Sequence, residues 1–274
     1  MFCYFTSDLH GHKSRYEKLF NLIIQEPPQI VFLTGDLLSR LSPQSFLLEY
    51  IVPNLKRMRN ILSERYPQIY LILGNNDERI YEEIIENISK ETLWNYIHLK
   101  KIKSGNYNIY GYNYSPPTPF LLKDWEKYDT NYEIKKGCIS PEIGKRTVEI
   151  SDEEKLSTIQ NDLEKLANNE NHSNSIFLFH APPYKTNLDK IGSSIESDSH
   201  VGSIAIRKFI EQKQPYLTLH GHIHESTRIT GKWKDKIGRT ICFNGAHDGE
   251  ELSIIKFHID NLENAERILI RPGF

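Results

Sequence analysis

Five short apolar segments in this chain each end directly in a group of Asp, Asn, His and Gly residues. The segments are Phe2–Thr6, Ile30–Leu33, Ile69–Leu73, Ile176–Phe179 and Tyr216–Leu219. Runs of this length and composition are typical of buried strands, and helical patterns lie between several of them. In an α/β sheet, polar side chains that follow the strands gather beyond the carboxyl ends, where the loops converge. The sequence therefore predicts an α/β fold with one polar crevice.

The segments between these strands carry helical periodicity. Ser14 and Glu17 have the spacing of a capping box, which predicts a helix start there. A long helical stretch is expected to bend or break at Pro53, and residues 201–210 are expected to form another helix. A further capping box, Ser151 with Glu154, predicts one helix that buries four apolar residues. These are Leu156, Ile159, Leu163 and Leu166.

Residues 113–150 are the one poorly patterned part of the chain. They contain several prolines and many aromatic residues without clear periodicity, and a loop of this length in a compact domain is usually functional or mobile. Four aromatic residues in or beside it could line a base pocket, although core or lid packing is the expected use: Tyr112, Tyr114, Phe120 and Trp125. No repeat or Gly/Ser-rich linker divides the chain. We expect a single domain over residues 1–274, with a loop-rich insertion at about 113–150.

The polar residues at the strand ends form a coherent set of metal ligands. The seven candidates are Asp8, His10, Asp36, Asn75, His180, His222 and His224. Carboxylates, imidazoles and an amide oxygen, without a thiolate, suit divalent Mn, Fe, Co, Ni or Zn. Any one of these residues alone could equally be a turn residue or a buried polar group. Five motifs in order, all at strand ends, favour a metal site.

These motifs resemble the ordered blocks of calcineurin-like metallophosphoesterases. The blocks are Asp8-Leu9-His10-Gly11, Gly35-Asp36, Gly74-Asn75-Asn76-Asp77, His180 and Gly221-His222-Ile223-His224. The resemblance implies a four-layer αββα sandwich, with two mixed β-sheets flanked by helices. It also implies a dinuclear centre in which Asp36 bridges the two ions. One ion would be bound by Asp8, His10 and His224, and the other by Asn75, His180 and His222.

Further segments resemble the Icc-related phosphodiesterase subgroup of this family. They are residues 180–184 (His-Ala-Pro-Pro-Tyr), 200–203 (His-Val-Gly-Ser), 221–226 and 117–120 (Pro-Thr-Pro-Phe). The subgroup resemblance is less specific than the metal blocks. It implies a phosphodiesterase that acts on a small nucleotide-like substrate.

Asn76 and His200 are the candidate catalytic residues besides the ligands. Many members of the family carry His at the place of Asn76, where it orients the phosphate or protonates the leaving oxygen. Asn can donate hydrogen bonds but cannot act as a general acid. The change either favours diesters or leaves the substrate unaltered. His200 precedes the predicted helix, whose N-terminus favours an anion; it could contact the substrate or supply a proton, or simply be a capping or surface residue.

The expected activity follows from two adjacent cations. Ions ~3.5–4 Å apart can clamp a phosphate and lower the pKa of a shared water, so that a bridging hydroxide attacks phosphorus in line with the leaving oxygen. We expect a phosphodiesterase with two divalent ions, manganese favoured. A phosphomonoesterase or protein phosphatase is the first alternative. A non-catalytic interaction protein on the same fold is the second, and the complete ligand set disfavours it.

Charge and composition limit the partners. A formal net charge of -2 offers no basic field for a nucleic acid, so the expected partner is a small-molecule phosphoester, with the oligomeric state left open. No apolar run approaches the length of a membrane span. Cys3, Cys138 and Cys242 lie far apart without zinc or redox spacing. A reducing cytoplasm is therefore the expected location.

Overall fold

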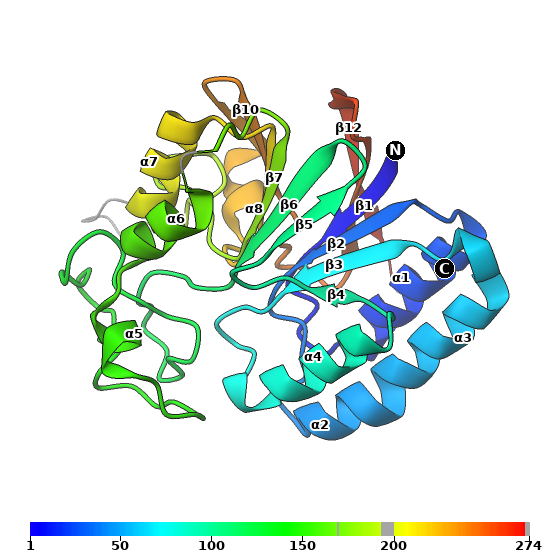
Figure 1. Ribbon diagram of the computed structural model, residues 1–274, viewed down its shortest axis with the longest axis horizontal. Helices are drawn as coiled ribbons and strands as arrows, with labels where there is room; N and C mark the ends of the chain where they lie inside the picture. The colour runs from blue at the N-terminus through cyan, green and yellow to red at the C-terminus, as the bar shows by residue number, and fades with distance from the viewer. Residues whose placement is uncertain (169, 193–199, 272–274) are drawn as a thin grey trace.

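Two six-stranded β-sheets form the centre of the molecule, and helices cover their outer faces (Figure 1). The computed structural model describes residues 1–168, 170–192 and 200–271. Both sheets contain parallel and antiparallel pairs. The predicted arrangement of two mixed sheets between layers of helices is confirmed.

The first sheet has the strand order β12-β11-β1-β2-β3-β4. Its parallel part consists of β1 (Phe2–Thr6), β2 (Ile30–Thr34), β3 (Gln68–Ile72) and β4 (Asn95–Tyr96). On the other side of β1 lie the antiparallel strands β11 (Leu252–His258) and β12 (Asn261–Ile270). The first strand of the chain is therefore an inner strand of its sheet.

The second sheet has the strand order β5-β6-β7-β8-β10-β9. Its parallel strands are β6 (Tyr107–Tyr112), β7 (Ser175–Phe179), β8 (Leu217–His220) and β10 (Thr240–Asn244). The antiparallel strands β5 (Lys101–Ser104) and β9 (Lys234–Ile237) form its two edges. Every strand that precedes a candidate ligand motif thus lies in the parallel part of a sheet.

Apolar side chains on alternate strand positions fill the space between the sheets. Phe5 and Phe32 from the first sheet and Ile176 and Leu219 from the second belong to one buried cluster. Successive side chains of a strand point to opposite faces, so the remaining positions are free to pack against helices. Strands β2 and β7 are buried at every residue because both of their faces are covered.

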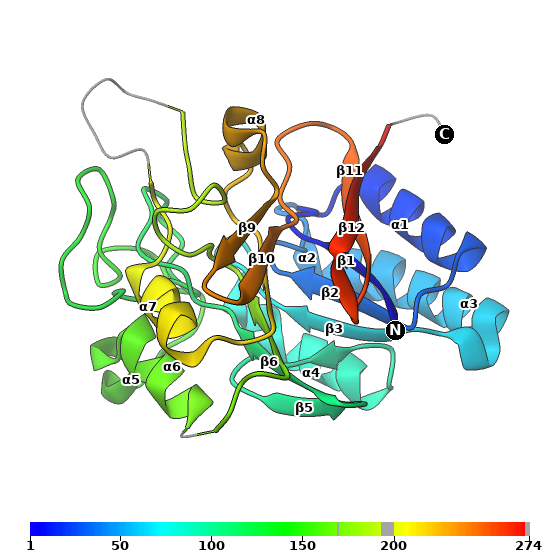
Figure 2. The ribbon, with the colours of Figure 1, turned by 90° about the horizontal axis from the view of Figure 1, so that it is seen from above.

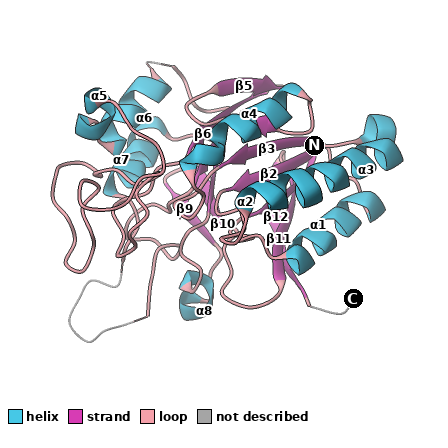
Figure 3. Ribbon diagram, turned by 90° about the horizontal axis from the view of Figure 1, so that it is seen from below, coloured by secondary structure: helices cyan, strands magenta, loops and turns pink. Residues whose placement is uncertain are grey.

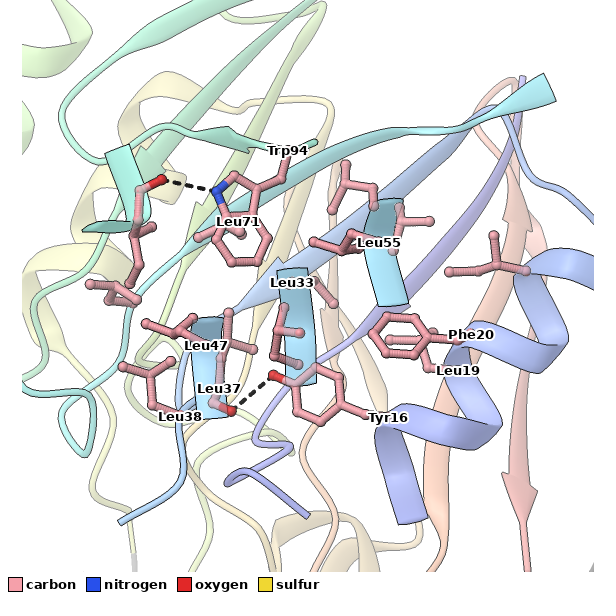
Figure 4. Close-up of a pocket in the computed structure, with 16 residues that line it drawn as sticks. Tyr16, Leu19, Phe20, Leu33, Leu37, Leu38, Leu47, Leu55, Leu71 and Trp94 are labelled. Atoms are coloured by element: carbon pink, nitrogen blue, oxygen red, sulfur yellow. Dashed lines mark hydrogen bonds between the residues drawn. The ribbon is translucent and has the colours of Figure 1, made fainter. Parts of the chain in front are cut away.

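The outer face of the first sheet is covered by α1 (Lys13–Gln25), α3 (Val52–Leu62) and α4 (Glu82–Lys90) (Figure 2). A cavity of about 30 Å³ remains among their apolar side chains (Figure 4). The Tyr16 hydroxyl donates to the Leu37 carbonyl, and Trp94 Nε1 donates to the Ile85 carbonyl. With its polar atoms satisfied, this space is a packing gap of about one water volume and offers a substrate nothing to recognise.

The outer face of the second sheet is covered by α6 (Ile159–Ala167) and α7 (Ile204–Lys213). Phe209 of α7 packs against Phe177 and Phe179 of β7, with ring centroids 4.9 and 5.9 Å apart. Two shorter helices, α5 (Asp152–Leu156) and α8 (Ser226–Thr230), lie beside this layer. In the part of the chain that is described, no helix is long and apolar enough to cross a membrane.

Two predicted helices differ in detail from the observed ones, one in its start and the other in its length. Helix α1 begins at Lys13 after His12, and Ser14 is already inside it, so the Ser14 capping box does not exist. Ser151 does accept a hydrogen bond from the Glu154 amide, but α5 ends at Leu156, which is 65% exposed. Thr158 then caps a second helix, α6, through its own capping box. Two N-caps seven residues apart produce two helices instead of one.

The helical stretch around Pro53 is irregular, but the irregularity lies before the proline. Helix α2 (Pro43–Ser45) runs into a π-helical segment, η1 (Phe46–Ile51), which α3 continues. Pro53 therefore lies in the first turn of α3, where the missing amide hydrogen is tolerated. Single 3₁₀ turns follow α3 and precede α4: η2 (Ser63–Arg65) and η3 (Arg79–Tyr81).

Residues 113–150 contain neither helix nor strand, and Figure 3 shows them among the long loops beside α5, α6 and α7. Buried polar pairs hold this insertion. Lys123 Nζ donates to the Thr118 carbonyl and to Glu126, whose carboxylate also accepts from the Thr118 amide and hydroxyl. Three of the four aromatic residues considered for a base pocket are fully buried, and only Phe120 is exposed: Tyr112, Tyr114 and Trp125 belong to the core.

Candidate metal centre

All seven predicted ligand residues lie together, where the loops after β1, β2, β3, β7 and β8 meet. Side-chain contacts join them without a break, from His10 and His224 through Asp8 and Asp36 to His180, and from His180 to Asn75 and His222. These residues come from both sheets, so the centre forms only when the two sheets pack together.

One half of the centre is a four-residue cluster of Asp8, His10, Asp36 and His224, with one potential ligand atom from each within 4.8 Å of all the others. His224 Nε2 lies 3.0 Å from Asp8 Oδ1 and 3.1 Å from His10 Nε2. Two imidazole nitrogens at hydrogen-bond distance share at most one proton. Nitrogen and oxygen atoms that converge in this way can hold a cation.

The other half is centred on His180. Its Nε2 lies 2.9 Å from Asn75 Oδ1 and 3.5 Å from Asp36 Oδ1, and its ring centroid is 4.9 Å from that of His222. Asp36 Oδ2 faces the first half, 3.7 Å from His10 Nε2. The two oxygens of this carboxylate therefore point to different halves, which is the geometry that a bridging ligand needs.

The backbone is strained at four of the candidate ligands. Asp8, His10, Asp36 and His222 have φ values of 55°, 48°, 53° and 71°, and a left-handed conformation at a residue other than glycine costs about 1–3 kcal/mol. Main-chain hydrogen bonds from Asp8 N to the Gly35 carbonyl and from His10 N to the Asp36 carbonyl stabilise these turns. Strain of this kind concentrates at functional sites.

Glycine is required where these loops approach the carboxylates. A Cβ atom on Gly221 would lie 2.4 Å from Asp8 Oδ2, and one on Gly74 would lie 2.3 Å from Asp36 Oδ1. Both distances are far below a van der Waals contact. The motif glycines therefore allow the backbone to approach the ligand carboxylates closely.

The carboxylates of the centre are buried, and among the described residues histidines are their only ion-pair partners. Asp8 and Asp36 are at most 1% exposed, and neither forms an ion pair with a Lys or Arg among the described residues. A third buried carboxylate, Asp77, accepts from the amides of Leu37, Leu38 and Gly74, and burial together with the Asp36 charge raises its pKa to about 7. Buried charge is unfavourable unless it is compensated, and bound cations would compensate these carboxylates.

The histidines are suited to ligation. Burial, reinforced by His180, lowers the pKa of His222 to about 3, and burial likewise lowers the pKa of His10. Both rings are therefore neutral, as a metal ligand must be. His224 differs: burial opposes its charge, but Asp8 outweighs burial and raises the His224 pKa to about 9. A cation bound there would displace this proton. His180 Nδ1 lies 2.8 Å from the Thr34 carbonyl, which orients Nε2 toward the centre.

Asn76 lies against the candidate bridging residue, and sequence reasoning missed its second partner. The Asn76 amide and side-chain nitrogens donate to the two oxygens of Asp36 at 2.8 and 2.5 Å. Asn76 Oδ1 accepts from Arg40 Nη2 at 2.6 Å. Arg40 is exposed on the loop that follows Asp36, so a guanidinium stands at the mouth of the centre. Its place four residues after Asp36 was the only available signal.

Contrary to the prediction from the sequence, His200 does not lie at an unoccupied helix N-terminus. Helix α7 begins at Ile204, and its N-terminus is already occupied by the Asp129 carboxylate, which accepts from Ser203 Oγ and from the amides of Ile204 and Ala205. His200 lies before this helix start, with Nδ1 2.7 Å from Oδ1 of the buried Asp189. Its described contacts join it to other loops and to none of the seven ligand residues. A role in the reaction stays a prediction.

A comparison with models of protein families identifies one family. The family model of calcineurin-like phosphoesterases matches residues 3–226. No curated protein matches the chain in sequence.

Solved structures share the fold. One chain, 14% identical, matches with a TM-score of 0.60, over 98% of this chain and 99% of that chain. The protein TT1561 of Thermus thermophilus, 17% identical, matches over the same shares with a TM-score of 0.57. A novel archaeal phosphodiesterase is 11% identical, with a TM-score of 0.48 over 98% of this chain and 100% of that chain, a similarity too weak to bear on the substrate. The first two likenesses support the fold alone.

Proposed function

The chain belongs to the calcineurin-like phosphoesterase family, and from this premise we propose that it hydrolyses a phosphodiester in a small, nucleotide-like molecule. Membership implies a metal-dependent phosphoester hydrolase. One observation carries the proposal: buried Asp8 and Asp36, which form no ion pair with a Lys or Arg among the described residues, lie within a shell of four histidines and Asn75.

We propose the following ligands. Asp8, His10 and His224 hold one divalent ion, Asn75, His180 and His222 hold the other, and Asp36 contacts both. The buried Nδ2 of Asn75 has no hydrogen-bond partner among the described residues, whereas its Oδ1 faces His180; an amide that presents its oxygen inward suits a cation. Two bound cations would supply charge neutralisation for the phosphate and a nucleophile near neutral pH. Manganese is the favoured metal.

Asn76 and Arg40 bind the substrate phosphate in this proposal. Hydrogen bonds to Asp36 and Arg40 fix the Asn76 side chain at the edge of the centre, and Arg40 adds one positive charge there. Neither group can protonate a leaving oxygen near neutral pH, because Asn has no acidic proton and Arg stays charged. A diester with a good leaving group can be hydrolysed without that proton. The pair therefore favours diesters.

The remaining parts of the proposal concern the chain as a whole. We propose one domain, because the ligands come from both sheets, and membership in the Icc-related subgroup. The described cysteines Cys3, Cys138 and Cys242 are all free, in keeping with a cytoplasmic enzyme. His200 is retained as a residue that contacts the substrate, in the pocket described below.

The test compares a diester and a monoester that share one leaving group. We expect a higher kcat/KM for bis-p-nitrophenyl phosphate than for p-nitrophenyl phosphate with manganese, and no activity after chelation. In Asn76→His the monoester should gain relative to the diester, because general-acid help is worth ~10²–10⁴-fold. A native preference for the monoester would instead identify a phosphomonoesterase. No hydrolysis of either ester with any divalent ion would reject the hydrolase itself.

A further inference from the structure

A polar pocket of about 430 Å³ lies outside the metal centre. Among the described residues it is lined by Lys185, Thr186, Asn187, Lys190, His200, Thr230 and Asp235. None of these is a candidate metal ligand. The pocket unites two segments that the metal chemistry leaves unused, the loop after residues 180–184 and the segment that begins at His200.

The walls of this pocket start at the metal centre. One wall is the loop that follows His180, and the other includes α8, which begins two residues after His224. Asn244 Nδ2 ties them together, since it lies within hydrogen-bond distance of the Leu188 carbonyl and of Ser226 Oγ, at 3.1 and 2.9 Å. Lys185 is five residues from His180, so their Cα atoms are at most roughly 18 Å apart. One extended small molecule can span this distance.

The buried carboxylate of Asp189 fixes the pocket loop. It accepts from the amides of Lys185, Thr186 and Gly202 at 3.1, 2.9 and 3.0 Å, and from His200 Nδ1. The Thr186 hydroxyl is a further donor at 3.4 Å, so the carboxylate is hydrogen-bonded on both oxygens. Lys185 itself has a φ of 55°, a conformation that the surrounding hydrogen bonds impose. The Lys185 side chain therefore starts from a backbone whose conformation is fixed by hydrogen bonds.

Among the described residues around the pocket, lysines outnumber acidic residues. Lys185 and Lys190 line it and form no ion pair with any acid in the described parts of the chain. Lys135 lies next to it, with Nζ 3.0 Å from the His200 carbonyl and 4.6 Å from the Tyr184 ring centroid. The one acid in the described lining, Asp235, already accepts from the backbone and side-chain nitrogens of Asn187. This local excess contrasts with a chain whose net charge is -2.

We propose that this pocket binds a second anionic group, a phosphate or carboxylate, carried by the same molecule whose phosphodiester lies at the metal centre. The proposal rests on the proposed function and narrows it, because the substrate becomes a phosphodiester that carries a further negative charge elsewhere in the same molecule. Lys185 and Lys190 supply the charge; an ammonium is a compact point charge that suits a phosphate.

The experiment uses two substrates that differ only in the second anion: the p-nitrophenyl ester of thymidine 5′-phosphate and the same ester with a 3′-phosphate. For the full chain with its metals, we expect the 3′-phosphate to lower KM about tenfold, which corresponds to about 1.4 kcal/mol. In Lys185→Ala/Lys190→Ala the ratio of the two kcat/KM values should fall to about one. The double arginine variant should keep most of the preference, and Lys103→Ala, which alters a lysine on β5, should keep all of it.

The outcome separates this proposal from the proposed function. If both esters are hydrolysed without preference, or if the double alanine variant keeps the preference, the pocket proposal is wrong and the phosphodiesterase stands. If neither ester is hydrolysed, the function is wrong, and calorimetry with inorganic phosphate on the full metal-free chain decides about the pocket. Binding that is lost in the double alanine variant would support the anion site, and equal heats in both proteins would reject it.

Discussion

The metal centre and the insertion at residues 113–150 both bury charged side chains, but they compensate that charge differently. In the insertion, Glu126 is paired with Lys123, and Lys127 of the insertion is paired with Asp162 of α6. In the metal centre, Asp8 and Asp36 have histidines around them and no Lys or Arg ion pair among the described residues. These two charges of the insertion are neutralised by ion pairs within the chain. The carboxylates of the centre have only imidazoles as partners, an arrangement that suits bound cations.

The largest expected effect is the loss of metal and activity when Asp36 of the metal centre is replaced. Asp36→Ala removes the carboxylate that faces both halves, and two nearby cations repel each other unless an anion lies between them. We expect metal content below one ion per chain, measured by mass spectrometry, and hydrolysis reduced to the level of the chelated protein. Asp36→Asn preserves the shape and should show the same loss, whereas Asp152→Asn on the exposed surface should not. Two ions and full activity in either Asp36 variant would refute the bridging role.

The next largest effect is a loss of stability when Glu126 of the insertion is replaced. Glu126→Ala leaves the fully buried Lys123 ammonium without its anion, which typically costs about 3–5 kcal/mol. The free energy of unfolding from denaturant titration should fall by that amount. Glu153→Ala is the matched control, because its ion pair with Lys165 is exposed and should contribute less than about 1 kcal/mol. Equal effects of the two substitutions would show that the buried pair does not hold the insertion.

The smallest effect concerns pH and the contact between the insertion and the second sheet. His98 packs among Tyr112, Tyr114 and Trp125 and accepts from the Asn113 amide. Burial, with the charges of nearby Arg79 and other basic residues, holds the His98 pKa well below its ordinary value. The unfolded chain therefore binds a proton near pH 6.5 that the folded chain excludes.

The sign of the resulting pH dependence follows from this difference in proton binding. Above about pH 6.5, His98 is neutral in both the folded and the unfolded chain and does not change the free energy of unfolding. Below about pH 6.5, the free energy of unfolding should fall by up to about 1.4 kcal/mol for each pH unit. His98→Asn keeps a hydrogen-bond acceptor but does not titrate. Its unfolding free energy should depend less on pH between about 6.5 and 5 than that of the native protein. Parallel slopes would show that His98 is protonated in the folded chain.

The same contrast explains what the sequence could predict. The seven candidate ligands were recognisable because each has a metal-binding residue type directly after a strand, so local order along the chain was enough. Arg40 was missed because its contact with Asn76 joins two separate loops. Such a contact leaves no hydrophobic periodicity or motif spacing in the sequence. The substrate preference and the metal identity depend on chemistry that the residue order does not express.

Other errors came from local patterns that compete with one another. Ser151 was a correct cap, but Thr158 was a second one, and the break between α5 and α6 followed from both. His200 was interpreted from a helix start that lies at Ile204 and is capped by Asp129, a residue of the insertion. Nothing near His200 in the sequence indicates this long-range partner. The buried pairs of the insertion were likewise unpredictable, since charged residues in a loop normally face solvent.

The inner position of β1 has a consequence for how the chain reaches its native state. Phe2–Phe5 pair on one side with Ile255–His258, which lie some 250 residues away in sequence. Contacts at such separation raise the contact order, and proteins dominated by them fold slowly because long loops must close first. Asp8, two residues beyond β1, cannot reach its final surroundings until residues 222–224 have been synthesised, because it contacts His222 and His224. During synthesis the metal centre is therefore among the last parts of the molecule to form, and the unpaired edge of β1 is exposed to other chains until then.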